Sequence, residues 1–206
     1  MLGQVSPALF VPVAESSGLI EQLGMMVLRE AMLLGARWPG RLMAVNISPA
    51  QLRNPRFAAE VLALLGETGM RAADLGLEIT EGTLLDDEPG TRQGLNTLRE
   101  AGIRIALDDF GTRYSSASYL RRYAVDRIKI GRAFTAQLSE GSVSVAIVQA
   151  MITLAHAMGI EVTAEGVETE AQFAVLAAMD CNTFQGFLLS PPVGPEQIEV
   201  MLRTMR

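Results

Sequence analysis

The sequence predicts an α/β fold, a (β/α)8 TIM-like barrel of which about six of the eight strands are recognisable. Short apolar runs alternate with helical stretches along the whole chain, which is typical of a parallel sheet covered by helices. Polar residues stand at the carboxyl end of nearly every apolar run. No glycine-rich nucleotide-binding turn is present.

Six apolar runs have the length and the Val, Ile and Leu content of strands. In chain order they are Leu42–Ser48, Leu75–Thr80, Ile103–Asp109, Arg127–Ile130, Glu161–Gly166 and Thr183–Leu189. The helical stretches are Leu19–Trp38, Pro55–Thr68, Gly90–Ala101, Ser142–Met158 and Thr169–Met179, and a last helix follows Pro195. Two helix starts read as capping boxes, Ser48 with Gln51 and Thr169 with Gln172.

The ends of the predicted strands separate two architectures, an open doubly wound sheet and a closed barrel. An open sheet usually binds its ligand through a glycine-rich turn after the first strand, and that turn is missing. A barrel gathers its functional side chains at the carboxyl ends of its strands. Those ends carry Asn46, Glu78, Asp108 with Asp109, Lys129, Glu165 and Gln185. This pattern favours the barrel.

The composition bounds the class of protein. With 206 residues, 49% hydrophobic, the chain is long enough for one globular domain spanning 1–206 and too apolar for disorder. The formal net charge of -6 argues against binding of long nucleic acid. One Cys and one His allow neither an internal disulfide nor a usual zinc site. No stretch reads as a membrane span or a signal peptide, so we expect a cytoplasmic protein.

The acidic strand ends predict a metal site with oxygen ligands. Several carboxylates on one rim would repel unless cations lie among them, and Mg²⁺ or Mn²⁺ suits such ligands. Asp108 and Asp109 both reach the site only if the backbone curls there. Two metals with Lys129 would suit phosphoryl displacement. Proton abstraction beside a metal-bound enolate stays open as a second chemistry. Any single carboxylate, Glu81 and Glu168 above all, also fits a helix-terminal role.

Seven segments together resemble the EAL-domain family, whose members are bacterial phosphodiesterases for cyclic di-GMP. The segments are VPVAESSGLI, NISPAQL, LEITE, ALDDFGTRYSS, DRIKI, TAEGVET and FQGFLLSPPV. They occur in the family order and extend across essentially the whole chain. The resemblance implies an enzyme of the EAL type that hydrolyses cyclic di-GMP to linear pGpG with two bound Mg²⁺ or Mn²⁺ ions.

The resemblance also implies roles for individual residues. The matched metal ligands are Asn46, Glu78, Asp108, Asp109 and Glu165. Lys129 matches the lysine that positions the attacking water, and Glu165 also matches the base. Glu168 and Gln185 match positions around the site. Glu81 matches the residue that anchors the loop Phe110–Ser116 after the aspartate pair.

The chain departs from the family pattern in three places. The Glu-Ala-Leu motif, which supplies one metal ligand and normally lies on a strand ahead of the first matched segment, is absent from the 206 residues. The resemblance therefore implies a (β/α)8 TIM-like barrel of the EAL type that is incomplete at the N-terminus. Arg113 replaces a glycine of the loop, and Gly131 stands where the family usually has Asp. We therefore expect an impaired phosphodiesterase, with a catalytically inactive cyclic di-GMP-binding or regulatory module as the alternative.

The missing segment leads to expectations about assembly. Two exposed sheet edges, at Leu42–Ser48 and Thr183–Leu189, predict a homo-oligomer or an unstable chain. The start of the sequence just ahead of a family motif is typical of a piece of a longer signalling protein with an upstream sensory or GGDEF domain.

Overall fold

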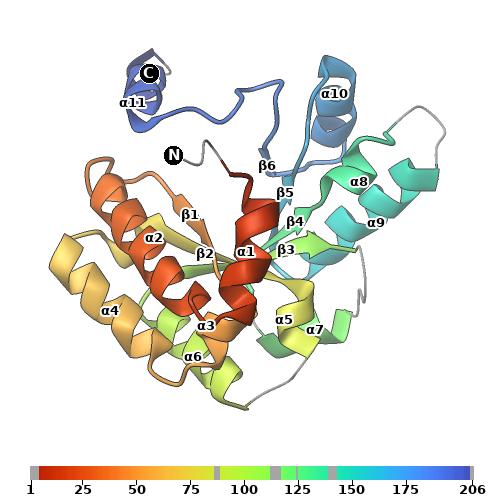
Figure 1. The fold of residues 1–206 in the computed structure, drawn as a ribbon. Helices are drawn as coiled ribbons and strands as arrows, with labels where there is room; N and C mark the ends of the chain where they lie inside the picture. Colours follow the sequence, from red (N-terminus) through yellow and green to blue (C-terminus); the bar gives the residue numbers. More distant parts are fainter. Residues whose placement is uncertain (1–4, 86–88, 112–116, 124, 139–142, 205–206) are drawn as a thin grey trace. The chain divides into compact units, whose positions relative to one another are not determined.

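The computed structural model confirms the α/β class and describes residues 5–85, 89–111, 117–123, 125–138 and 143–204. Six strands follow one another in the sheet in sequence order, and the pairs β1–β2, β4–β5 and β5–β6 are parallel (Figure 1). The strands are β1 (Met43–Asn46), β2 (Leu75–Thr80), β3 (Arg104–Phe110), β4 (Arg127–Ile130), β5 (Glu161–Ala164) and β6 (Thr183–Phe184).

Helices precede and separate the strands. Ahead of β2 lie α1 (Pro7–Ser16), α2 (Ile20–Gly35), α3 (Pro49–Arg53) and α4 (Phe57–Thr68), with the short 3₁₀ helix η1 (Ala72–Asp74). Between β2 and β5 lie α5 (Glu81–Leu85), α6 (Pro89–Glu100), α7 (Ala117–Tyr123), α8 (Arg132–Thr135) and α9 (Val143–Ala157). The last two are α10 (Glu170–Ala178) and α11 (Pro195–Thr204). No helix in the described part of the chain has the length and apolar run needed to cross a bilayer.

The chain divides into two compact units. Unit 1 comprises residues 1–106 and 116–125, and unit 2 comprises residues 107–115 and 126–206. Strand β3 begins in the first unit and ends in the second. That the whole chain acts as one domain stays a prediction, and the two units are described in turn.

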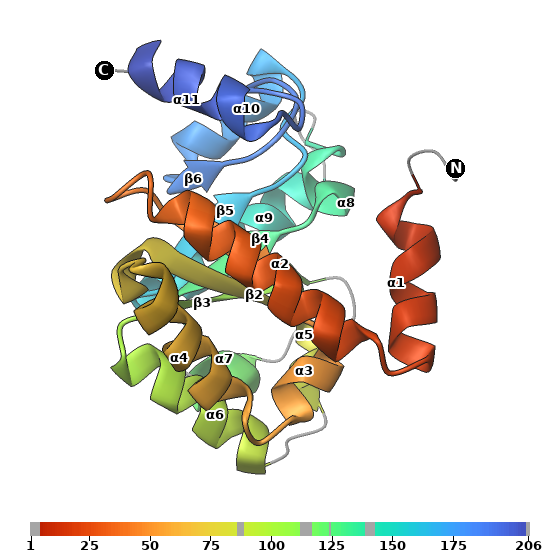
Figure 2. The ribbon, with the colours of Figure 1, turned by 60° about the vertical axis from the view of Figure 1, so that its left-hand side comes forward.

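In unit 1 the two faces of the β1–β2 ladder differ in polarity. Leu75, Leu77 and Ile79 alternate along β2 and are fully buried, and Val45 on β1 is also buried. Burying one such side chain stabilises the fold by about 1.5–3 kcal/mol. Helix α2 packs against β1 and against α4, as Figure 2 shows for the two helices. The opposite face of the ladder carries the polar residues of these strands.

In unit 2 one face of the strands β4, β5 and β6 is apolar. Ile128, Ile130, Val162 and Ala164 have no exposed surface, and α9 packs against β5. These residues alternate with the polar ones because successive side chains of a strand point to opposite faces. The buried face therefore fixes which side chains lie on the other face.

The other face of β4–β6 carries a polar ladder. Arg127 pairs with Glu161 across the strands, in register and at their amino ends. Two residues after Glu161, the hydroxyls of Thr163 on β5 and its register partner Thr183 on β6 are hydrogen-bonded at 2.6 Å. Lys129 lies on the same face as Arg127, two residues closer to the carboxyl end. The strand pattern thus brings the lysine to the carboxyl ends of the strands.

Both predicted capping boxes are present. The Ser48 hydroxyl accepts from the Gln51 amide at 3.3 Å, and Gln51 Oε1 accepts from the Ser48 amide. Thr169 and Gln172 make the same reciprocal pair at the start of α10. These contacts satisfy amide groups that the first turn of a helix leaves without partners.

The last strand is much shorter than the sequence predicts. The apolar run Thr183–Leu189 reads as one strand, whereas β6 ends at Phe184. A side chain at Gly186 would come within 2.1 Å of the Val167 carbonyl oxygen, so the two backbones touch there. The Val167 amide donates to the Gln185 carbonyl, and the Leu188 amide donates to the Val167 carbonyl. The chain turns around Val167 instead of continuing as a strand.

Candidate functional site

The residues that the sequence places at strand ends lie there in the structure. Asn46 is the last residue of β1, Glu78 lies in β2, and Asp108 and Asp109 lie near the end of β3. Lys129 is the next-to-last residue of β4, and Glu165 and Gln185 directly follow β5 and β6. The alternation of apolar and polar residues in each strand is therefore a reliable guide to position.

In unit 2 a buried lysine joins two of these carboxylates. Lys129 Nζ lies 2.6 Å from Glu165 Oε1 and 3.4 Å from Asp108 Oδ1. The lysine side chain is 5% exposed, against 19% for Glu165 and 17% for Asp108. Because these groups are largely shielded from water, their electrostatic interaction is stronger than that of a surface pair.

The backbone curl expected at the aspartate pair is present. Asp109 has a φ of 54°, in the left-handed region, although the strand continues to Phe110. Its amide donates to Asp108 Oδ1 at 3.0 Å. Aspartate tolerates this conformation better than most residues with a side chain. The left-handed residue breaks the regular alternation of the strand, so adjacent aspartates both reach the same site.

Three carboxylates converge around this curl. One oxygen each of Asp108, Asp109 and Glu165 lies within 4.8 Å of the others. Three ionised carboxylates beside one lysine leave a net negative charge, which a cation would balance. Carboxylate oxygens are the ligands that Mg²⁺, Mn²⁺ and Ca²⁺ prefer. The donor set therefore fits a divalent metal that binds oxygen.

The segment after Glu165 is folded tightly against helix α8. Gly166 has a φ of 64°, and a Cβ atom there would lie 2.4 Å from Arg132 Cγ. Arg132 Nη2 pairs with Glu168 Oε1 at 2.8 Å. Glu168 therefore contacts an arginine, and it is not among the carboxylates that gather around Lys129. Gln185 is exposed, and its backbone amide donates to the Ala164 carbonyl at 2.8 Å.

In unit 1 an amide and a carboxylate are neighbours. Asn46 and Glu78 are partners in the parallel register of β1 and β2, so both side chains lie on the polar face of this ladder. Asn46 is exposed and Glu78 is half-buried. Within unit 1 the pair offers two oxygen donors of the kind that metal sites use.

Glu81 begins α5 and is 3% exposed. Neither of its carboxylate oxygens has a hydrogen-bond partner among the described residues. Burial of a charged group without a partner is costly, so this side chain needs an interaction. The loop that it is expected to anchor, Phe110–Ser116, lies outside the described residues from position 112 onward, and Arg113 with it.

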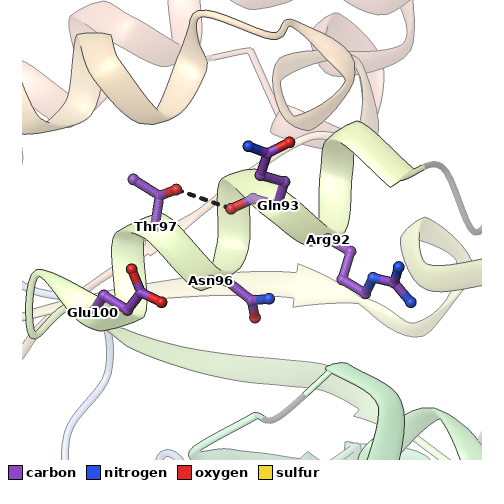
Figure 3. A pocket seen from close by; sticks show the side chains of 5 residues that line it. All are labelled: Arg92, Gln93, Asn96, Thr97 and Glu100. Atoms are coloured by element: carbon purple, nitrogen blue, oxygen red, sulfur yellow. Dashed lines mark hydrogen bonds between the residues drawn. The ribbon is translucent and has the colours of Figure 1, made fainter.

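A pocket of about 480 Å³ lies elsewhere, along the solvent face of α6. Figure 3 shows its lining, Arg92, Gln93, Asn96, Thr97 and Glu100, all from this one helix. The Thr97 hydroxyl donates to the Gln93 carbonyl of the same helix at 3.0 Å. None of the residues expected to act in catalysis lines the pocket, so we do not assign the site to it.

Comparison with known proteins identifies the family. The model of the EAL domain matches residues 2–192, and the chain belongs to this family. It is 39% identical over 206 residues to cyclic di-GMP phosphodiesterase PA2567 of Pseudomonas aeruginosa, covering 98% of this chain and 35% of the relative. The chain spans about a quarter to a third of the length of the curated relatives it matches.

Solved structures agree with this assignment. The PaMucR phosphodiesterase in complex with c-di-GMP has a TM-score of 0.89 and 38% identity, covering 95% of this chain and 81% of that one. A manganese and cy-diGMP complex of Klebsiella pneumoniae BlrP1 has a TM-score of 0.77 and 30% identity. It covers 84% of this chain and 45% of the other. The fold is therefore the barrel type of EAL domains, as the strand-end pattern predicts.

Proposed function

We propose that this domain hydrolyses one phosphodiester bond of cyclic di-GMP and releases linear pGpG. The observation that carries the proposal is the contact of 2.6 Å between Lys129 Nζ and Glu165 Oε1, beside Asp108 and Asp109. Membership of the EAL family and a relative named as a cyclic di-GMP phosphodiesterase support the substrate.

Lys129 and Glu165 have different roles toward the attacking water. As an ammonium, Lys129 forms ion pairs with Glu165 and Asp108, and its N–H groups would orient the attacking water beside Glu165. Glu165 accepts a proton from that water while the water oxygen bonds to phosphorus. The bond between phosphorus and the 3′ oxygen breaks, and the leaving oxygen takes a proton from solvent.

The cofactor that we propose is Mg²⁺ or Mn²⁺, in the two-metal site of the family. Asp108, Asp109 and Glu165 would hold it, and Asn46 and Glu78 would supply further oxygens. When bound, such a cation stabilises the negative charge on the phosphoryl group and its oxygens. Glu168 and Gln185 would support the site, and Glu81 would anchor the loop after the aspartate pair.

We propose that turnover by these 206 residues is slow. The sequence contains no Glu-Ala-Leu tripeptide, so one of the metal ligands implied by the family resemblance is not among its residues. A weaker metal site stabilises the transition state less.

The test is release of pGpG from cyclic di-GMP with Mg²⁺ or Mn²⁺, separated by chromatography. We expect Lys129→Ala and Glu165→Ala to lower the rate by about 100-fold or more. Arg127→Ala and Glu161→Ala are matched controls, because this ion pair lies on the same two strands at their amino ends. Rates that both active-site substitutions leave unchanged would refute the assigned roles.

The alternative is a module that binds cyclic di-GMP without cleaving it, and the absent tripeptide is the observation that favours it. Calorimetry separates the two functions. Binding in excess EDTA, with no pGpG when metal is restored, would establish the binding module and contradict the enzyme. No binding under any condition would exclude it.

We also propose that the domain self-associates and works in the cytoplasm as part of a longer signalling protein. Among the described residues β1 pairs with β2 alone, which leaves one edge open. One relative is named a bifunctional diguanylate cyclase/cyclic di-GMP phosphodiesterase, which supports an adjoining GGDEF or sensory domain. A monomeric mass by light scattering, together with a sharp thermal unfolding transition, would contradict self-association. The reading frame that adjoins this sequence in the gene tests the proposal of a longer protein.

A further inference from the structure

Helix α8 lies between the lysine and the glutamate of the site in sequence, and it contacts the glutamate directly. It begins three residues after Lys129, across Ile130 and Gly131. Thr135, its last residue, is fully buried, and its Oγ1 lies 2.5 Å from the Glu165 carbonyl oxygen. This four-residue helix has no periodic pattern that the sequence reveals.

The single proton of the Thr135 hydroxyl has two acceptors in reach. The Arg132 carbonyl lies at 3.2 Å, but it already accepts from the Ala136 amide at 2.9 Å. The Glu165 carbonyl lies closer. The hydroxyl therefore donates to Glu165, since the shorter contact is the stronger hydrogen bond.

Both backbone groups of Glu165 are thus held by the segment that carries Lys129. The Glu165 amide donates to the Ile130 carbonyl at 3.0 Å, and its carbonyl accepts from Thr135. One residue further along, the Arg132 side chain lies over Gly166, and it pairs with Glu168. The segment 165–168 is held at its backbone and at a side chain by residues 130–135.

We propose that Thr135 is a positioning residue that fixes the Glu165 carboxylate against Lys129, where this carboxylate would hold the proposed metal. This inference rests on the proposed function. With its backbone held on both sides, Glu165 keeps its Cα–Cβ bond in a fixed direction, which favours the rotamers that bring the carboxylate to Lys129 Nζ. A carboxylate held in place binds a metal more tightly than one that must be ordered on binding.

Three substitutions separate positioning from packing. Thr135→Val keeps the shape and removes the hydroxyl, Thr135→Ser keeps the hydroxyl and removes the methyl, and Thr135→Ala removes both. The matched control is Thr163→Val, because Thr163 is also buried, lies on β5 two residues before Glu165, and bonds Thr183 instead. Mn²⁺ affinity is measured from the electron paramagnetic resonance signal of the free ion, beside melting temperature and turnover.

We expect Thr135→Val and Thr135→Ala to raise the Kd for Mn²⁺ by about 10-fold and to lower turnover by about 10- to 100-fold. Thr135→Ser should bind Mn²⁺ as the unsubstituted chain does. Thr163→Val should lose stability without losing affinity. The difference between Val and Ser at one position is a readout that a packing role would not produce.

Two results would overturn the inference. One is unchanged Mn²⁺ affinity in Thr135→Val, and the other is a loss in Thr135→Ser as large as in Thr135→Val. Absence of Mn²⁺ binding to the unsubstituted chain would overturn it as well. Affinity that depends on the hydroxyl, with no cleavage of cyclic di-GMP by any variant, would instead refute the proposed function and keep Thr135 as a positioning residue.

Discussion

Replacing Lys129 by Ala should destabilise the metal-free protein and leave the metal-bound protein less affected. The ammonium is the cation that the structure places among Asp108 and Glu165, at 3.4 and 2.6 Å. Removing it leaves carboxylates that repel one another in a site largely shielded from water. A divalent cation restores the lost positive charge, so metal and lysine partly substitute for each other in stability.

The magnitude follows from the burial of the three side chains. Breaking a fully buried ion pair by removing one partner costs about 3–5 kcal/mol. Here the lysine is 5% exposed, but the two carboxylates keep 17% and 19%. Because water screens them in part, we expect a loss of about 2–3 kcal/mol. For a chain of this length that corresponds to a fall in Tm of about 4–12 °C.

The assay is thermal denaturation of Lys129→Ala and the unsubstituted protein, each in EDTA and in excess Mn²⁺. Arg127→Ala is the control, because Arg127 lies on the same strand and face but pairs with the half-exposed Glu161. That pair should contribute at most about 1 kcal/mol. Equal melting temperatures for Lys129→Ala and Arg127→Ala in EDTA would refute the reasoning, and so would a loss that Mn²⁺ does not reduce.

Three further predictions concern single residues. Gly166→Ala should lower turnover more than Gly159→Ala, because both glycines have positive φ but only the Cβ at 166 would meet Arg132; equal rates in the two variants would contradict this. Glu81→Met should lower turnover, because the buried carboxylate has no partner among the described residues and we propose that it anchors the loop after the aspartate pair; unchanged turnover would contradict that role. Burial raises the pKa of the Cys181 thiol above its ordinary value of 9.0, so a disulfide reagent should label it slowly until the protein unfolds. The same shift stabilises the fold fully below that ordinary value, and the gain is lost as pH rises through the raised pKa; rapid labelling of the native protein would contradict the burial.

Much of the architecture follows from alternation in the sequence. The positions of Glu78 and Lys129 are predictable, because their neighbours in β2 and β4 are apolar and one face of each strand must be buried. The curl at Asp109 is predictable from chemistry as well, since two adjacent aspartates reach one site only if the strand departs from regular geometry. The capping boxes follow from local hydrogen bonding alone.

What the sequence does not reveal depends on close contacts between distant segments. The run Thr183–Leu189 is apolar enough for a strand, but the contact of Gly186 with the Val167 backbone ends β6 after two residues. Helix α8 is too short for a periodic pattern, so Thr135 passes for an ordinary polar residue. Only the structure reveals that its hydroxyl donates to the carbonyl of Glu165, thirty residues away in the sequence.

The left-handed conformation of Asp109 decides which mutants can measure its charge. Most replacements would impose a backbone penalty of about 1–2 kcal/mol at this position and would move Asp108 as well, because the Asp109 amide donates to that carboxylate. Alanine scanning would therefore confound loss of the carboxylate with loss of the curl. Asparagine tolerates the same dihedral angles and keeps one oxygen, so Asp109→Asn removes the charge and preserves the curl. Glycine frees the backbone and removes the side chain. Comparing these two variants separates the electrostatic contribution of the second aspartate from its geometric one.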